Sequence, residues 1–187
     1  MADEVPDVTA VRKALASLSS RRDWNPPRLG AMDMEIRADG SWWHEGSEIA
    51  RPALVRLFAS ILRCREGRHE LATPVECWEI RVQDSAFVVR DWHWDRSGHT
   101  PVMIVRTNVE ESFLLEDARC FRLSLSSAGE PRPYVLVRDG LEARVPPIIY
   151  YQWLEEATLV EQAGSLQALL TSGDATFCLG DVPSTEV

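Results

Sequence analysis

Apolar side chains recur at helical spacing near the start of the chain. The residues in this pattern are Val8, Val11, Leu15 and Leu18. Asp7 precedes them and is a candidate N-cap, because its carboxylate can accept a hydrogen bond from the first turn. Pro26 and Pro27 break the pattern, since proline cannot continue a helix. The spacing predicts a helical arm over 8–20, followed by a linker.

The next pattern is a hairpin that runs into a helix. Apolar and polar residues alternate in 33–38 and 42–46, and an Asp-Gly pair typical of tight turns lies between them. Pro52 suits the first position of a helix, where its missing N–H group costs nothing. The residues expected on the buried face of this helix are Leu54, Leu57, Phe58, Ile61 and Leu62.

Strand-like runs follow Gly67, the expected end of that helix. The longer runs span 69–73, 75–82, 86–94 and 101–108. Short polar segments join them, which predicts an antiparallel meander. Two shorter strands are expected at 113–115 and 120–126.

The second half of the chain repeats this order of elements. A strand, an Asp139-Gly140 turn and a shorter returning segment lead to Pro146, which begins a helix. The residues expected on its buried face are Tyr150, Trp153, Leu154 and Ala157. A hairpin that turns at 172–174 follows. Because the two Asp-Gly turns begin at Asp39 and Asp139, 100 residues apart, the order favours two related units.

These patterns predict an α+β protein of two repeated units. Each unit consists of antiparallel hairpin or meander strands with one packed helix, and a short N-terminal helix precedes them. The expected divisions are an arm at 1–23, a first unit at 24–110, a second unit at 111–181 and a tail at 182–187.

Composition and charge restrict the classes of partner. The 187 residues are 45% hydrophobic and 26% charged, which is ordinary for a globular protein with its own core. The net charge of -9 disfavours nucleic acid and anionic membranes as partners. A few basic residues cluster at Arg12, Lys13, Arg21 and Arg22, which is typical of a solvated helix face.

Several features indicate a cytoplasmic protein. The four cysteines are widely spaced, without a C-x-x-C pair, and are expected to be reduced and mostly buried. The N-terminal MADEVPDV has no apolar core of a signal peptide. The most hydrophobic run, PPIIYYQWL, is too short to cross a bilayer.

One segment, DWHWDRSGH, is a candidate metal site. The candidate ligands are Asp91, His93, Asp95 and His99. Nitrogen and oxygen ligands of this kind suit a divalent cation. However, Phe87 and Val89 would share the same strand face. The pattern is therefore also typical of a strand that runs from the core to a solvated hairpin tip, which is the interpretation we favour, without a metal.

A candidate ligand site lies around the first hairpin. Alternation sends Trp42 to one face of the strand and Trp43 to the other. An exposed indole beside arginines can stack on a ligand or donate a hydrogen bond to it. Glu76 stands outside the strand alternation that follows it and is expected near a cleft. The candidate ligand-binding residues are Trp43, His44, Arg51, Arg56 and Glu76. The structural alternative is a tryptophan that covers the hairpin and arginines that face solvent.

Common catalytic signatures are missing from the sequence. It contains no G-x-S-x-G, G-x-x-x-x-G-K-[ST], G-x-G-x-x-G or H-E-x-x-H motif. His44 has acidic neighbours suited to acid–base chemistry, but no nucleophile lies at a spacing from it that would indicate catalysis. We therefore expect no catalytic residues and no cofactor, and place an enzyme third among the possible functions.

Four segments in order resemble one bacterial family, domain of unknown function 1285. They are DMEIRADGSWWHEGSEIARPALVRLFASIL, LATPVECWEIRVQDSAFVV, RTNV and EPRPYVLVRDGLEA, and the resemblance spans about residues 24–180. It implies a cytosolic bacterial protein of two repeated α+β motifs, with a suggested role in signal transduction and no known catalytic residue. Our leading hypothesis is a regulatory module that binds a small molecule or peptide between its two units. The second hypothesis is a protein–protein adaptor that uses exposed tryptophans and the N-terminal helix.

Overall fold

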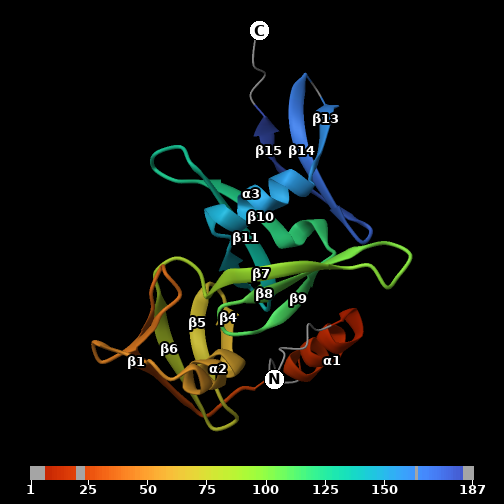
Figure 1. The fold of residues 1–187 in the computed structure, drawn as a ribbon. Helices are drawn as coiled ribbons and strands as arrows, with labels where there is room; N and C mark the ends of the chain where they lie inside the picture. Colours follow the sequence, from red (N-terminus) through yellow and green to blue (C-terminus); the bar gives the residue numbers. More distant parts are fainter. Residues whose placement is uncertain (1–6, 20–23, 163, 183–187) are drawn as a thin grey trace.

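A computed structural model describes residues 7–19, 24–162 and 164–182 of the chain (Figure 1). These residues form two six-stranded sheets, one three-stranded sheet and three α-helices. The fold is α+β, with two similar six-stranded units and a short N-terminal helix, as the sequence predicts. No helix in the described residues has the length and apolar character needed to cross a membrane.

The first sheet has the strand order β3-β2-β1-β6-β5-β4. Its strands are β1 (Arg28–Ile36), β2 (Trp42–His44), β3 (Ser47–Glu48), β4 (Leu62–Arg65), β5 (Arg68–Ala72) and β6 (Glu76–Val82). Helix α2 (Pro52–Ile61) connects β3 to β4. Strands β1 and β6 pair in parallel, and every other neighbouring pair in this sheet is antiparallel. The sheet therefore consists of two three-stranded meanders that meet at one parallel pair.

The second sheet repeats that plan in the order β10-β11-β12-β7-β8-β9. Its strands are β7 (Phe87–Asp95), β8 (Val102–Thr107), β9 (Ser112–Leu115), β10 (Phe121–Leu125), β11 (Pro131–Arg138) and β12 (Leu141–Arg144). The short helix η1 (Ala118–Cys120) lies between β9 and β10. Strands β12 and β7 form the central parallel pair. Two antiparallel meanders again meet at one parallel junction.

The C-terminal part adds a helix and a small sheet. They are α3 (Pro147–Glu156), β13 (Thr158–Gln162), β14 (Ser165–Ser172) and β15 (Ala175–Val182). The predicted hairpin turn is confirmed, since β14 and β15 pair antiparallel up to Ser172 and Ala175. The predicted face of α3 is also confirmed, because Tyr150 and Trp153 are buried and Leu154 packs against the core.

The expected meander through 69–108 is wrong at one junction. Strands β6 and β7 do not pair, because the chain passes from the first sheet to the second between them. A short polar connection between two strands looks the same in a sequence whether it closes a hairpin or crosses between sheets. The expected division after residue 110 therefore does not coincide with the change of sheet, and β7 and β8 pair within the second sheet.

Helix α2 is shorter than predicted, and its predicted buried face is confirmed in part, since Phe58 and Ile61 pack against the core and Leu62, just after the helix, is buried. It ends at Ile61, and Glu66 and Gly67, with φ of 54° and 78°, close a β4–β5 hairpin. Ala59 is its buried residue, whereas Leu57, predicted to be buried, is 57% exposed. Apolar residues occur all around this helix, so the spacing alone did not determine which side meets the core.

The N-terminal helix α1 (Val8–Ser19) packs on the second sheet. The predicted cap is confirmed, because the Asp7 carboxylate accepts a hydrogen bond from the Ala10 amide at 2.7 Å. Val11 is buried against Ile104 of β8 and Leu114 of β9. The side chains of Leu15 and Leu18 lie outside the described ones, as do Arg21 and Arg22.

The two Asp-Gly turns join the units in a reciprocal way. Gly40, in the first unit, lies so close to the second sheet that a Cβ atom there would be 2.9 Å from Val88. Gly140, in the second unit, lies against Cys64 of β4. One cluster of buried apolar side chains extends through both units. The two sheets therefore share a core and position a common boundary, where the candidate site lies.

Candidate ligand-binding cleft

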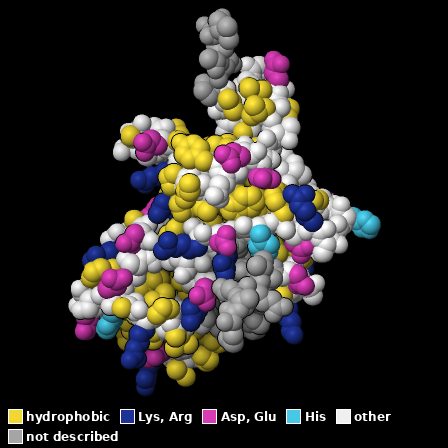
Figure 2. Space-filling model, viewed as in Figure 1, with side chains coloured by type: hydrophobic (Ala, Val, Ile, Leu, Met, Phe, Trp, Pro, Cys, Tyr) yellow, Lys and Arg dark blue, Asp and Glu magenta, His cyan; other side chains and the backbone are white. Residues whose placement is uncertain are grey.

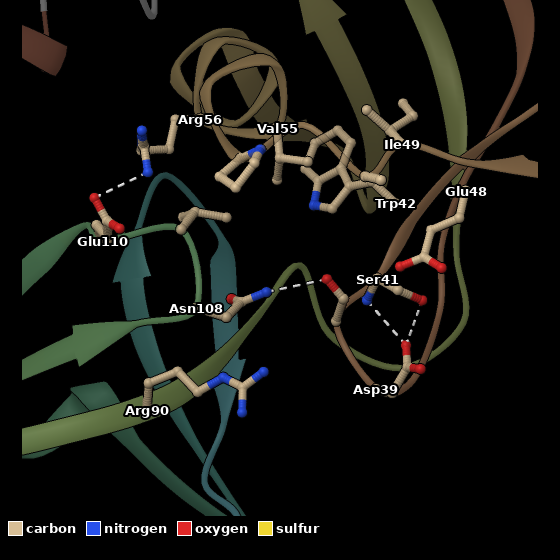
Figure 3. A pocket seen from close by; sticks show the side chains of 14 residues that line it. Asp39, Ser41, Trp42, Glu48, Ile49, Val55, Arg56, Arg90, Asn108 and Glu110 are labelled. Atoms are coloured by element: carbon tan, nitrogen blue, oxygen red, sulfur yellow. Dashed lines mark hydrogen bonds and ion pairs between the residues drawn. The ribbon is translucent and has the colours of Figure 1, made fainter.

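A cleft of about 620 Å³ opens at the boundary between the two units (Figure 3). The first unit contributes the 39–42 turn, residues 48–50 and the start of α2. The second unit contributes Arg90 of β7 and residues 108–110, which follow β8. This volume lies within the range of small-molecule sites in proteins. A bound molecule would contact both units at once.

Hydrogen bonds hold the turn that forms one wall of the cleft. The Asp39 carboxylate accepts bonds from the amide and hydroxyl groups of Ser41, at 2.9 and 2.6 Å, and these bonds lower the pKa of Asp39. The Asn108 amide donates to the carbonyl oxygen of Gly40 at 3.0 Å and accepts from the Val88 amide at 3.0 Å. Asn108 therefore fixes the turn of the first unit against the second sheet, and this wall is formed before a ligand arrives.

The first turn of α2 forms another part of the wall. Pro52 occupies the N-terminal position of the helix, and the residue before it, Arg51, makes no side-chain capping bond. The amides of Leu54 and Val55 reach back to the Arg51 carbonyl oxygen at 3.0 and 3.1 Å. The start of a helix carries partial positive charge, so this end of α2 favours an acceptor or an anion.

Trp42 provides a buried donor that lacks an acceptor. Its side chain is 1% exposed and stacks on Phe58, with ring centroids 6.2 Å apart. Within the described residues, the indole Nε1–H group has no hydrogen-bond partner. Figure 3 shows this nitrogen on the side of the ring that faces the opening. Buried donors are almost always bonded, and an unmade bond costs about 1–3 kcal/mol. An acceptor from a bound molecule would remove that penalty.

The charged residues of the cleft divide into paired and unpaired groups. Arg56 and Glu110 form an ion pair across the boundary at 3.0 Å. Asp39 is engaged by Ser41, as described above. The side chains of Arg90 and Glu48 are exposed and make no hydrogen bond or ion pair with any described residue. Among the residues that the structure describes, one unpaired cation and one unpaired carboxylate therefore border the cleft.

Comparisons with known proteins identify the family. Residues 21–85 match the family model "Domain of unknown function (DUF1285), N-terminal domain", and residues 86–179 match "Protein of unknown function (DUF1285), C-terminal domain". The chain belongs to the DUF1285 family. The resemblance seen in the sequence is thus confirmed, and the two DUF1285 models meet where the chain passes from the first sheet to the second.

Two solved structures of DUF1285 proteins are similar to this chain. One, from Silicibacter pomeroyi DSS-3, is 37% identical, covers 90% of this chain and 94% of its own, and superposes with a TM-score of 0.74. The other, from Shewanella baltica OS155, is 25% identical, covers 67% of this chain and 92% of its own, and gives a TM-score of 0.55. No curated protein matches the sequence.

Of the ligand-binding residues predicted in this DUF1285 protein, Arg56 lines the cleft. The guanidinium of Arg37 covers the Trp43 ring at 3.5 Å, and the Trp43 indole N–H group donates to the Ser41 hydroxyl at 2.9 Å. Trp43 is thus held within its own hairpin, as in the structural alternative. His44, at the end of β2, pairs with Ser47 of β3.

Arg51 and Glu76 also lie outside the lining of the cleft. Glu76 pairs with Arg28, whereas Val82, six residues further along β6, pairs with Ile36 near the turn. At 3.3 Å per residue, Glu76 is therefore roughly 20 Å from the hairpin end. The structure does not bring Glu76 together with Trp43. Ligand contacts by Trp43, His44, Arg51 and Glu76 stay predictions without support from this geometry.

Sequence patterns did not mark Trp42, Arg90 and Asn108 as cleft residues. Alternation placed Trp42 and Trp43 on opposite faces of the strand, and the structure buries Trp42, but no pattern indicated its missing acceptor. Arg90 lies at an irregularity of β7, between Val89 and Asp91, where the pairing register with β8 shifts. Asn108 belongs to RTNV, one of the segments that carry the family resemblance. Its position as a polar residue directly after a strand is the feature of the sequence that could have indicated it.

The candidate metal ligands lie on the predicted β7–β8 hairpin, where the two aspartates among them have other partners. Asp91 pairs with Arg106 at 2.9 Å. Asp95 accepts bonds from the amides of Ser97 and Val8, at 2.8 and 2.9 Å. In the described part of the chain, no three His, Cys, Asp or Glu side chains form a group that could hold a metal ion. The four cysteines are free, and Cys178 is exposed rather than buried.

The tryptophans of this segment have a structural role. The indole N–H groups of Trp92 and Trp94 donate to Gln152 and Glu156 of α3, at 2.8 and 3.1 Å. Both rings also pack against the core. They therefore attach α3 to β7 on the side of the second sheet that carries the C-terminal strands.

Proposed function

We propose that this protein is a non-enzymatic regulatory module of the cytoplasm that binds a small molecule between its two units. The observation that supports this most is the buried Trp42 N–H group, which lacks an acceptor and lies at a cleft lined by both units. A donor of this kind suits a ligand acceptor, and the free charges of Arg90 and Glu48 add specificity. The role in signalling implied by the family resemblance fits such a module.

The mechanism is a ligand-dependent shift in how the units pack. Two polar contacts already cross the boundary at the cleft, the Asn108–Gly40 hydrogen bond and the Arg56–Glu110 ion pair. A ligand that contacts both walls stabilises the arrangement in which both contacts are made. Helix α2 lines the cleft through Pro52, Val55 and Arg56 and also carries the exposed Leu57, so a change in its position would connect the site to a surface that a partner can contact.

Thermal unfolding with a panel of metabolites tests this function. A compound that binds the folded state raises the melting temperature, and the shift grows with the logarithm of its concentration once that concentration exceeds the Kd. The Ala50→Trp variant places a large side chain in the lining of the cleft and is expected to abolish the shift. The Ala128→Trp variant, in the exposed β10–β11 turn, is the matched control. A panel without any shift, or a shift that Ala50→Trp leaves intact, would overturn the proposal.

An adaptor function is the second candidate, through a different surface from the one predicted. All seven tryptophans are buried or half-buried, so they do not supply the expected contact surface. Other apolar side chains are exposed on α3 and β13, namely Ile148, Tyr151 and Leu159. Figure 2 shows hydrophobic side chains gathered over this upper part of the molecule. Co-purification of one stoichiometric partner that Tyr151→Ser releases would favour this function over ligand binding.

A further inference from the structure

We infer that the ligand of the cleft is a zwitterion of dipeptide size, with a carboxylate held by Arg90 and an ammonium group held by Glu48. This inference rests on the proposed function and specifies its ligand class. It depends on three groups that border one opening and lack partners among the described residues: the Arg90 guanidinium, the Glu48 carboxylate and the Trp42 N–H group.

The unpaired charges favour a ligand that carries both signs. Arg90 can bind a carboxylate through two parallel N–H···O bonds, and Glu48 can accept bonds from an ammonium group. A purely anionic ligand would leave Glu48 unpaired and would also face the carboxylates of Asp39 and Glu110, which line the same cleft. A purely cationic ligand would leave Arg90 unpaired. A zwitterion satisfies both groups without a net change in charge.

The positions of Arg90, Glu48 and Trp42 favour a ligand whose positive and negative charges lie at opposite ends. Figure 3 shows Glu48 and Arg90 on opposite sides of the opening, with the Trp42 nitrogen facing the space between them. A short peptide has an ammonium group, a carbonyl oxygen and a carboxylate in that order along its length. Its carbonyl oxygen can supply the acceptor that the Trp42 N–H group lacks once the ring turns its covered nitrogen into the opening. The cleft of about 620 Å³ is large enough for two residues.

The remaining lining suits an apolar side chain of such a peptide. Ile49, Val55 and Val109 contribute apolar surface from both units. The uncapped first turn of α2 adds positive potential on the same wall. These features strengthen binding, whereas the charged groups determine which class of ligand binds.

Isothermal titration with matched probes tests the inference. The probes are alanyl-leucine, its N-acetyl derivative without the ammonium charge, its C-terminal amide without the carboxylate, and inorganic phosphate. The free dipeptide is expected to bind, and each capped form to bind about tenfold or more weakly, because each loses one charge-assisted contact. Free dipeptides with smaller and larger side chains, such as glycyl-glycine and leucyl-leucine, extend the panel.

The variants assign each charge to its partner. Arg90→Gln is expected to lose the preference for the free carboxylate over the amide, and Glu48→Gln the preference for the free amine over the acetylated form. Trp42→Phe keeps an aromatic ring at this position, although a smaller one, but removes the N–H group, and weakens binding of all peptides alike. Arg28→Gln and Glu155→Gln, at exposed positions outside the cleft, are the charge-matched controls and leave binding unchanged.

Three results would overturn the inference: no free dipeptide binds, the capped forms bind equally well, or phosphate binds more tightly. These failures are distinguishable from failure of the proposed function. If a compound of another class binds and Ala50→Trp abolishes its binding, the ligand-binding function stands and the zwitterion is wrong. If no compound binds in a way that Ala50→Trp affects, both are wrong.

Discussion

The guanidinium of Arg138 donates a hydrogen bond of 2.8 Å to the backbone carbonyl oxygen of Ala59, so a strand of the second sheet closes the last turn of helix α2 in the first unit. The same guanidinium donates to the Leu62 carbonyl oxygen at 2.9 Å and pairs with Glu111 at 2.6 Å. The side chains of Arg138 and Glu111 are 6% and 11% exposed. This network crosses the boundary between the units close to the cleft, and it is shielded from solvent.

Replacing Arg138 is expected to destabilise the whole protein. Arg138→Met keeps much of the side-chain volume but leaves Glu111 buried without its partner, and such a loss costs about 3–5 kcal/mol. Urea titration followed by tryptophan fluorescence measures this free energy of unfolding. Arg119→Met is the control, because Arg119 is 89% exposed in its pair with Asp117, and such surface pairs contribute little to stability. Equal costs for the two variants would contradict a role for Arg138 in joining the units.

The glycines of the first hairpin offer a matched pair of variants. Gly40 and Gly46 both have positive φ, at 86° and 76°. A Cβ atom at Gly40 would lie 2.7 Å from Asn108 and 2.9 Å from Val88, whereas at Gly46 nothing lies within 4 Å. Gly46→Ala is thus expected to cost about 1–2 kcal/mol from backbone strain alone. Gly40→Ala is expected to cost about 1–3 kcal/mol more, because the turn must move away from the second sheet.

Thermal unfolding of both variants tests this difference, and ligand titration of the same samples tests its consequence for the cleft. Displacement of the Gly40 turn is expected to weaken ligand binding, whereas Gly46→Ala should leave it unchanged. If both variants lose the same stability, the turn does not pack against the second sheet in solution.

Local sequence signals predicted the elements well, because their causes lie within a few residues. The Asp-Gly turns, the proline-started helices and the Asp7 cap depend on backbone preferences of neighbouring positions. The pairing of the sheets was harder to predict. The parallel pair of β1 and β6 joins Leu29 to Cys77, and nothing in either strand alone specifies that partner.

The candidate site depended even more on distant contacts. Arg56 was found because it lies near the hairpin in sequence, but Arg90 and Asn108 come from the other unit. The missing acceptor of Trp42 results from how Phe58 and the cleft wall surround its ring, and no periodicity encodes an unmade bond. Sequence patterns thus predicted the hairpin of the cleft, whereas the chemistry of its opening required the three-dimensional packing of both units.

Removal or addition of divalent metal ions is expected to leave stability unchanged. Asp91 is paired with Arg106, and Asp95 is bonded to two backbone amides, so neither carboxylate is free to bind a cation. Melting temperatures measured with EDTA, zinc and manganese should agree to within about 1 °C, because a ligand changes stability only when it binds the folded state. A rise of several degrees with one metal, lost in His93→Asn, would contradict this expectation.

Attachment of helix α1 is expected to weaken at low pH through Asp95. Hydrogen bonds from Ser97, and then from the Val8 amide, lower the pKa of Asp95 from 3.8 to about 2. Because the folded-state pKa is lowered, this carboxylate stabilises the folded state above pH 3.8 and loses the effect as the pH falls toward 2, and the Val8 bond, a smaller cause than Ser97, is the part of the effect that holds helix α1. Hydrogen exchange of residues 8–19, corrected for intrinsic rates, is therefore expected to show protection that falls over this range.

Asp95→Asn removes the charge and is expected to show lower protection at neutral pH and a smaller fall on acidification. Glu116→Gln is the control, since it removes the Arg12 partner of the same helix but keeps Asp95. If the wild type and Asp95→Asn lose protection equally between pH 3.8 and 2, Asp95 does not hold the helix.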